Sequence, residues 1–386
     1  AFGPAGTSGP PNTALRSPFS ALPAFLWPFG HLAIWPFHSL RLAKRAPRPP
    51  LHPSSEPPLP LRRPKISVIG AGNIGGECAR SIAMKELGDV VLLDIQNAAK
   101  PELHMPKGKA LDLACCAPVE GFDAKITGTF DYADIAGSDV VVVTAGVPRK
   151  PGQSRDDLVA INAGIVKNVA QNIKQYAPNA YVIVVSNPLD AMVYVMWKAT
   201  GFPANRIMGQ AGALDVARYK AFLAMELNCS AEDIQGLLLG GHGDDMVPLP
   251  RLTSVNGIPI QDLLPAEKIK ACVERAKKGG GEIVALMGTS AWYAPSAGTV
   301  EMVEAIVRDK KRVIASAAYC EDEFGVAPGQ KGQGLFVGVP CVLGGNGVEK
   351  IITFNMTPEE RKDMDESISH VRDLIAITRK LLPDLG

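Results

Sequence analysis

The segment from Ile66 to Gly76 constrains the fold more than any other part of the sequence. An apolar run, Ile66-Ser-Val-Ile, leads directly into Gly70-Ala-Gly72-Asn-Ile-Gly75, and a helical pattern follows. In such a segment the first glycine permits a tight turn, the second lets a pyrophosphate approach the backbone, and the third lets the helix pack closely on the strand. The start of the helix offers free N–H groups to phosphates. The segment therefore predicts a strand-turn-helix unit that binds a dinucleotide.

The next expected strand supports this prediction because it ends in an acid. Asp89-Val-Val-Leu-Leu-Asp94 places Asp94 24 residues after Gly70, close to the spacing of a ribose-binding carboxylate. A glycine triplet alone is a weak signal, whereas the combination is much more specific. The carboxylate of Asp94 would accept hydrogen bonds from the ribose and repel a 2′-phosphate, which favours NAD over NADP.

Strand and helix patterns alternate up to about Met208, which predicts right-handed βαβ crossovers and a parallel sheet. The expected strands span residues 66–70, 90–94, 124–128, 139–144, 181–185 and 206–208. The fold class is therefore α/β: a Rossmann-type, doubly wound parallel sheet domain at 65–208, followed by a mixed α+β domain at 209–386.

The second half contains antiparallel pairs and a long final helix. Residues 334–354 alternate strand patterns around a Gly-Asn-Gly turn. Thr357-Pro-Glu-Glu360 predicts a capping box with proline in the first turn. Four apolar residues then recur at helical spacing and are expected in the core rather than at an interface: Met364, Ile368, Val371 and Ile375.

A loop with two arginines follows the expected strand at 139–144. The segment Gly146-Val-Pro-Arg149-Lys-Pro-Gly-Gln-Ser-Arg155 lies where ligands bind in open α/β sheets, at the carboxyl end of a strand. Arginine binds a carboxylate through two parallel hydrogen bonds. The loop is either a solvated basic loop or one that closes on an anion.

Candidate catalytic groups lie in three further segments. Gly240-Gly-His242-Gly-Asp-Asp follows the mostly apolar run 234–239. Three histidines lie beyond the leader, namely His104, His242 and one in the final helical pattern. By elimination His242 is the candidate proton carrier, because imidazole titrates near working pH. Asp215 and Arg218 share one helical face, either as an ordinary ion pair or as a histidine partner and a carboxylate anchor. Asn187, at the end of another apolar strand, could hold a substrate oxygen and the nicotinamide ribose.

Composition agrees with a globular, two-domain protein. The chain has 386 residues, 46% hydrophobic residues and a formal net charge of +1, which argues against a nucleic-acid partner. Seven cysteines form no Cys-x-x-Cys pair, which predicts a reducing compartment, no disulfides and no metal site. We interpret the adjacent Cys115 and Cys116 as packing residues.

Together these segments resemble the lactate/malate dehydrogenase family from about Lys65 to the C-terminus. The resemblance implies that His242 is the acid/base, Asp215 its partner, Arg155 the polarising arginine of a mobile loop and Arg218 the carboxylate anchor. It also implies that Asn162 and Val185-Ser186-Asn187 line the cofactor site. The full expected set of NAD-binding residues is Gly70, Ala71, Gly72, Asn73, Ile74, Gly75, Asp94, Asn162, Val185, Ser186 and Asn187.

Position 149 separates the substrates within this family. Enzymes that act on lactate place glutamine there, and enzymes that act on malate place arginine, so Arg149 predicts malate and oxaloacetate as substrates. The second carboxylate of oxaloacetate, once desolvated, needs such a partner. Ser290-Ala-Trp-Tyr-Ala-Pro and Lys311-Arg-Val-Ile resemble the lactate-dehydrogenase-like branch of malate enzymes, which implies a homotetramer, or otherwise a homodimer. The alternatives are a lactate or other 2-hydroxy acid dehydrogenase and, more distantly, a non-catalytic nucleotide sensor.

Residues 1–64 resemble a transit peptide. They hold seven Arg and Lys residues, the single acid Glu56 and many prolines. Prolines also interrupt the apolar stretch 19–40, so no membrane span is expected. We expect a mitochondrial location, with a plastid or secretory signal as an alternative. The leader begins at Ala1 without methionine; if it is an artefact of the gene model, we expect a cytosolic enzyme.

The chain departs from the family pattern in one connection. The segment from Gln96 to Met105 is longer than the family usually has, which affects the adenine side of the cofactor site.

Overall fold

The parallel sheet predicted for the first half is present. The computed structural model describes residues 62–148, 155–243 and 245–385, with the backbone alone at positions 155 and 156. Six parallel strands pair in the order β3-β2-β1-β4-β5-β6, so the strand order reverses between β1 and β4. Ligands bind at this reversal in open α/β sheets. The strands are β1 (Lys65–Ile69), β2 (Asp89–Leu93), β3 (Ile126–Thr129), β4 (Val140–Val143), β5 (Tyr181–Val184) and β6 (Ile207–Gly209).

The same sheet continues into the second half through an antiparallel contact between β6 and β12, where Gly209 pairs with Ala317. Antiparallel pairing then joins β12 to β13, β13 to β14 and β8, and β8 to β9. These strands are β8 (Leu238–Gly240), β9 (Met246–Pro248), β12 (Arg312–Cys320), β13 (Leu335–Gly344) and β14 (Gly347–Ile351). A separate small sheet contains β7 (Ile234–Gln235), β10 (Ser254–Val255) and β11 (Ile258–Pro259).

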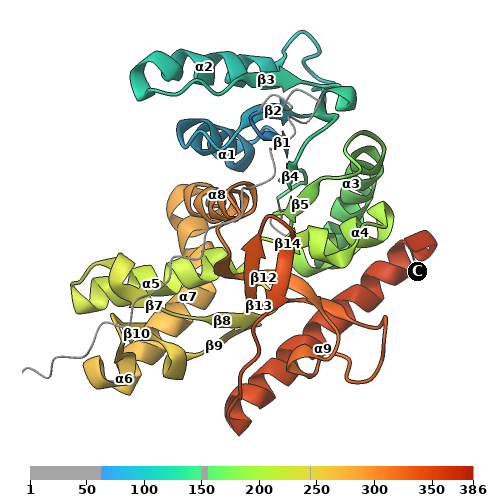
Figure 1. The fold of residues 1–386 in the computed structure, drawn as a ribbon. Helices are drawn as coiled ribbons and strands as arrows, with labels where there is room; N and C mark the ends of the chain where they lie inside the picture. Colours follow the sequence, from blue (N-terminus) through green and yellow to red (C-terminus); the bar gives the residue numbers. More distant parts are fainter. Residues whose placement is uncertain (1–61, 149–154, 244, 386) are drawn as a thin grey trace, which may run out of the picture. The chain divides into compact units, whose positions relative to one another are not determined.

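Helices cover both faces of the parallel strands, as Figure 1 shows: α1 and α8 lie on one side, and α3 and α4 on the other. Helix α9 packs against α4, and α7 packs against α5. The helices are α1 (Asn73–Met84), α2 (Met105–Glu120), α3 (Arg155–Tyr176), α4 (Leu189–Thr200), α5 (Gly212–Leu227), α6 (Ile260–Leu263), α7 (Ala266–Met287), α8 (Tyr293–Val307) and α9 (Pro358–Leu381).

Two apolar cores result from the alternation of side chains along the strands. Val68 and Val142 belong to the core beneath α1 and α8, whereas Ile69 and Val143 belong to the core beneath α3 and α4. Strands buried on both faces read as continuous apolar runs, which explains why β4 consists of four valines. The doubly wound sheet predicted from the sequence is therefore confirmed.

The details of the final helix are also confirmed. The Thr357 side chain accepts a hydrogen bond from the Glu360 backbone, and the Glu360 side chain accepts one from the Thr357 backbone, which closes the capping box. The four apolar residues predicted for the core are each 2% exposed or less. The Gly-Asn-Gly turn connects the antiparallel strands β13 and β14.

The apolar run 234–239 contributes to two short strands in different sheets, β7 and β8, and His242 follows the end of β8. One expectation is wrong in part. Cys115 is exposed rather than packed, since α2 buries little of its surface; Cys116 is half-buried and does pack against a small core.

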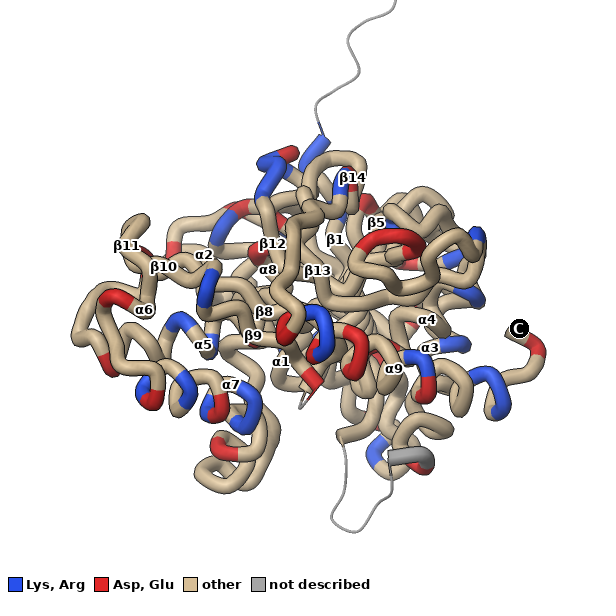
Figure 2. Tube along the Cα trace, turned by 90° about the horizontal axis from the view of Figure 1, so that it is seen from below, with Lys and Arg blue, Asp and Glu red and all other residues tan. Residues whose placement is uncertain are grey.

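Within the described part of the chain, no helix is both long and apolar enough to span a membrane. Basic and acidic residues alternate along α7 and α9 rather than forming a region of one sign (Figure 2).

Candidate active site

The glycine turn has the geometry of a phosphate-binding loop. Gly70 has a positive φ of 107°, which L side chains rarely adopt. A Cβ on Gly75 would lie 1.8 Å from the Gly70 carbonyl oxygen, so the third glycine is required for the close approach of α1 to β1. A Cβ on Gly72 would meet nothing within 4 Å, and no side chain caps the N-terminus of α1. The open space and the uncapped helix end fit a bound pyrophosphate.

Asp94 lies beside this turn, as predicted. Its Oδ2 accepts a hydrogen bond from the Ala71 backbone N–H at 2.7 Å, and its Oδ1 accepts one from the Ile95 N–H at 2.7 Å. A carboxylate oxygen has two lone pairs, so both oxygens can also accept from ribose hydroxyls. Lys109, which the sequence did not single out, donates to the carbonyls of Ala71 and Gly72 at 2.7 and 2.9 Å. Burial lowers the pKa of Lys109, and the charge of Asp94 opposes this effect.

The longer connection after Asp94 ends in a packed histidine. The His104 ring stacks on Phe130 with ring centroids 3.8 Å apart, and its Nδ1 accepts a hydrogen bond from Lys107 N–H at the start of α2. These contacts give His104 a structural role in the described part of the chain.

The predicted residues of α3 and of the segment after β5 are brought together by hydrogen bonds. Asn162 is buried, and its side chain donates to the Asn187 carbonyl at 2.6 Å and to the Val147 carbonyl at 3.1 Å. The Ser186 hydroxyl donates to the Ala145 carbonyl at 2.6 Å. Asn162 therefore connects the chain that follows β4 with the chain that follows β5, both at the carboxyl edge of the sheet.

His242 and Asp215 form a buried pair. His242 Nδ1 lies 2.9 Å from Asp215 Oδ2, and the two side chains are 18% and 3% exposed. Burial lowers the pKa of His242, but the charge and hydrogen bond of Asp215 raise it, and the net shift is upward. Because Nδ1 faces Asp215, Nε2 is the ring nitrogen left to exchange a proton with a substrate.

Arg218 lies one helical turn from Asp215 and is mostly buried, at 14% exposure. One guanidinium nitrogen is 3.7 Å from Asp215 Oδ1, which is beyond hydrogen-bond distance, and the buried Arg218 Nε has no hydrogen-bond partner among the described residues. Burial lowers the pKa of Arg218, against the influence of Asp215. A buried guanidinium with an unused donor fits an anion such as a carboxylate. Space for its stem comes from α7, where a Cβ on Gly279 would lie 3.2 Å from Arg218 Cδ.

Two predicted residues cannot be compared with this geometry. Arg149 lies outside the described residues, and Arg155 begins α3 but its side chain lies outside them as well. The described site residues therefore form three groups: those around the glycine turn, those joined by Asn162 and those around His242.

Besides Lys109, sequence reasoning missed the residues that hold the loop of His242. Asp190 accepts the His242 backbone N–H at 3.1 Å, and Ser367 accepts the Gly241 N–H at 2.8 Å. Asp190 follows Asn187 closely in the sequence, which was a usable signal. Ser367 lies in an amphipathic helix and carried none.

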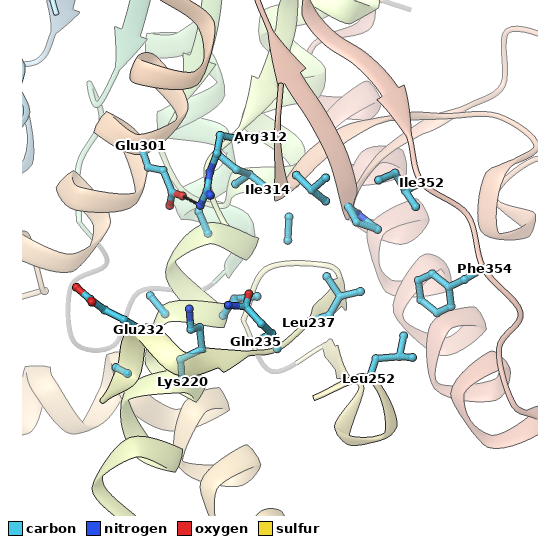
Figure 3. A pocket seen from close by; sticks show the side chains of 18 residues that line it. Lys220, Glu232, Gln235, Leu237, Leu252, Glu301, Arg312, Ile314, Ile352 and Phe354 are labelled. Carbon is cyan, nitrogen blue, oxygen red and sulfur yellow. Dashed lines mark hydrogen bonds and ion pairs between the residues drawn. The ribbon is translucent and has the colours of Figure 1, made fainter. Parts of the chain in front are cut away.

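A separate groove of about 610 Å³ is lined partly by α5 but by none of these residues (Figure 3). Leu237, Leu252 and Phe354 line its apolar part, and an ion pair of 2.7 Å between Arg312 and Glu301 lies at one side. No proton-transfer couple is among its lining residues, so we do not assign the chemistry to it.

Comparison with known proteins agrees with these features. The sequence profile described as "lactate/malate dehydrogenase, NAD binding domain" matches residues 64–209, and the profile described as "lactate/malate dehydrogenase, alpha/beta C-terminal domain" matches residues 212–380. The chain therefore belongs to the lactate/malate dehydrogenase family, and its cofactor is NAD.

Relatives and solved structures give a finer comparison. The chain is 56% identical to a malate dehydrogenase of Rhodopirellula baltica over 325 residues, which is 84% of this chain and all of the relative. A malate dehydrogenase structure from Picrophilus torridus matches with a TM-score of 0.79 and 45% identity, covering 84% of this chain and all of that one. A Cryptosporidium parvum lactate dehydrogenase in complex with lactic acid and NAD matches with a TM-score of 0.77 and 40% identity, covering 82% and 98%.

Proposed function

We propose that this protein is an NAD-dependent malate dehydrogenase, which transfers a hydride reversibly between NADH and oxaloacetate to give (S)-malate. The observation that carries the proposal is the buried His242–Asp215 couple with Arg218 one turn away. It supplies a proton carrier and a carboxylate-binding cation within one site. Relatives named malate dehydrogenase, at more than 50% identity over nearly their whole length, support the choice of substrate.

The proton and the substrate are handled by this chain's own residues. In the protonated ring, Nδ1–H donates to Asp215 and Nε2–H donates to the keto oxygen of the substrate. When the Nε2 proton moves to that oxygen, the neutral ring keeps its bond to Asp215. The raised pKa of His242 favours the protonated ring that reduction needs. Arg218 would bind the carboxylate next to the reacting carbon.

The remaining roles complete the proposal. Arg155 polarises the carbonyl from the loop, Arg149 pairs with the second carboxylate of oxaloacetate, and Asn187 holds the substrate oxygen and the nicotinamide ribose. NAD, when bound, supplies or accepts the hydride. The turn at 70–75, Asp94, Asn162 and the segment 185–187 would hold it, and the open space at Gly72 supports this placement.

Lactate dehydrogenase is the close alternative, because the structures of both enzyme types resemble this chain. Arg149 favours malate. A non-catalytic nucleotide sensor is the distant alternative, and the buried His242–Asp215 couple argues against it.

The test is an NADH-oxidation assay of the full chain with oxaloacetate, pyruvate and 2-oxoglutarate, supplied one at a time. We expect the highest kcat/KM with oxaloacetate. A preference for pyruvate would replace the proposal with the lactate alternative, and absence of NADH turnover with every keto acid would contradict the enzymatic assignment.

We also propose that the protein forms a homo-oligomer, a tetramer or otherwise a dimer. Apolar residues exposed on α2 support this, with Leu111 at 68% and Val119 at 87% exposure, as does the apolar groove of Figure 3. Such surfaces on a soluble protein favour contact with another chain. Light scattering during size-exclusion chromatography measures the mass. Leu111→Glu with Val119→Glu should lower it, while Ile258→Glu, on the small sheet, should not.

We propose that residues 1–64 are a mitochondrial transit peptide, dispensable for folding and catalysis, and that 65–208 and 209–386 are the cofactor and substrate domains. The segment 1–64 is too rich in proline and too irregular in pattern to join a packed core. A fluorescent reporter fused behind the leader should reach mitochondria, and a diffuse signal would contradict the targeting proposal.

A further inference from the structure

A buried carboxylate from the parallel-sheet part of the chain holds the loop that carries His242. Asp190 lies in the first turn of α4, directly after β5 and far from His242 in sequence, and is 4% exposed. Its Oδ2 accepts the backbone N–H of His242 at 3.1 Å. The same oxygen would be 3.4 Å from a Cβ on Gly241, so the loop passes directly over the carboxylate.

We propose that Asp190 is a second carboxylate partner of His242, a positioning residue that fixes the histidine backbone and stabilises the protonated ring by its charge. The inference rests on the proposed function, because it assigns a role in the same proton transfer. In this proposal Asp190 acts through the histidine rather than on the substrate or the cofactor.

The position of Asp190 favours a charged carboxylate. The positive end of a helix dipole stabilises an anion in the first turn, and α4 places Asp190 there. Within a buried site, a charge interacts more strongly with its neighbours than it does in water.

The charged groups around His242 come from several elements. Asp215 and Arg218 lie on α5 and Asp190 on α4, while Asp245, in the loop of His242, pairs with His370 of α9 at 2.7 Å. The side chains of Arg149 and Arg155 lie outside the described residues. Burial and the charge of Arg218 lower the pKa of His242, whereas Asp215 and then Asp190 raise it. Asp190 thus acts in the same direction as Asp215.

Ser367 of α9 provides a matched control because it holds the same loop without a charge. Its hydroxyl accepts the Gly241 N–H at 2.8 Å, one residue before His242, and is also buried. Removing Ser367 therefore tests the positioning of the loop alone. Removing the charge of Asp190 while keeping an acceptor for the His242 N–H tests proton affinity.

The experiment compares the full-length wild type with Asp190→Asn, Asp190→Glu and Ser367→Ala. Asparagine keeps an oxygen for the His242 N–H and removes the charge, while glutamate keeps the charge. The first measurement is the titration midpoint of His242 by NMR of protein labelled at histidine, assigned by the signal missing in His242→Gln. The second is the pH profile of kcat/KM for oxaloacetate reduction.

We expect Asp190→Asn to lower the midpoint by about one pH unit, the lower end for loss of a nearby opposite charge. Reduction needs the protonated ring, so the decline of kcat/KM on the alkaline side should move to lower pH by the same amount. Asp190→Glu should restore the wild-type midpoint. Ser367→Ala should lower kcat/KM without moving the midpoint.

An unchanged midpoint in folded Asp190→Asn, or an equal shift in Ser367→Ala, would overturn the proposal. Circular dichroism and NADH binding report whether each variant folds, and Asp190→Ser, a smaller neutral acceptor, replaces the asparagine variant if that one does not. The NMR titration needs no turnover. If the wild type fails to reduce oxaloacetate, the proposed function fails while the titration still tests the role of Asp190.

Discussion

The two parts of the candidate active site differ in the groups that form them, which are mainly backbone in one part and buried side chains in the other. The cofactor side consists mainly of backbone: three glycines within six residues shape the turn, and the uncapped start of α1 faces open space. The histidine side consists of buried side chains, in which Asp190, Asp215, His242 and Ser367 come from four separate segments. A short piece of sequence specifies the first, whereas the second exists only after folding.

This difference predicts different consequences of substitution. On the histidine side, removing one group disrupts a network of charges and should reduce the rate of chemistry. On the cofactor side, adding a methyl group should change stability or NADH binding instead.

The largest effect should follow from His242→Asn. General acid–base catalysis contributes about 10²- to 10⁴-fold, and weaker substrate binding adds to the loss of turnover. NADH binding, measured by fluorescence titration, should persist because the proposed role of the ring is proton transfer and substrate contact, not holding the dinucleotide. Near-normal activity would refute the assignment of His242 as the proton carrier.

The next effect concerns the two arginines of the loop at 146–155. Arg149→Gln should reduce kcat/KM for oxaloacetate by roughly 30- to several-thousand-fold, since truncating one partner of a desolvated charge pair costs about 2 to 5 kcal/mol. The kcat/KM for pyruvate should not fall in this variant. Arg155→Gln should reduce the rate with both substrates, because it faces the carbonyl that they share. Equal losses with both substrates in Arg149→Gln would remove the main support for malate specificity.

A pair of glycine variants tests the cofactor side. Gly75→Ala should lower the free energy of unfolding by about 1 to 3 kcal/mol, as overpacking does, because its Cβ would lie 1.8 Å from the Gly70 oxygen. Gly72→Ala should leave the stability of the free protein nearly unchanged, since its Cβ meets nothing, and weaken NADH binding. For each variant, urea denaturation measures the free energy of unfolding and NADH titration measures cofactor affinity. Equal stability of the two variants would contradict the close packing of α1 on β1.

The smallest expected effect is a change of cofactor preference. Asp94→Ser with Ile95→Arg should admit NADPH, because the carboxylate that repels the 2′-phosphate is gone and a cation replaces an exposed side chain. NADH affinity should fall about tenfold, in line with the loss of hydrogen bonds to a charged group. Use of NADPH by the wild type at a rate similar to NADH would show that Asp94 has been misinterpreted.

Sequence reasoning succeeded for features that a short piece of sequence specifies and failed for features that exist only after folding. The turn at 70–75, the six parallel strands and the capping box at Thr357 were predictable because each depends on neighbours in sequence. The division of residues 234–239 between two sheets was not, since it depends on pairing with β10 and β13, which lie further along the chain. The exposure of Cys115 was missed because helical spacing does not reveal which face finds a partner.

By itself, the sequence determined the class of fold and the dinucleotide turn, because glycine spacing and apolar periodicity are local properties, and it was enough to propose His242 as the proton carrier. Only the tertiary structure decided how His242 is held. Asp190 and Ser367 come within hydrogen-bond distance of the histidine loop when α4 and α9 pack around it. No periodicity encodes that contact, since it results from the burial of apolar surface elsewhere on the same helices.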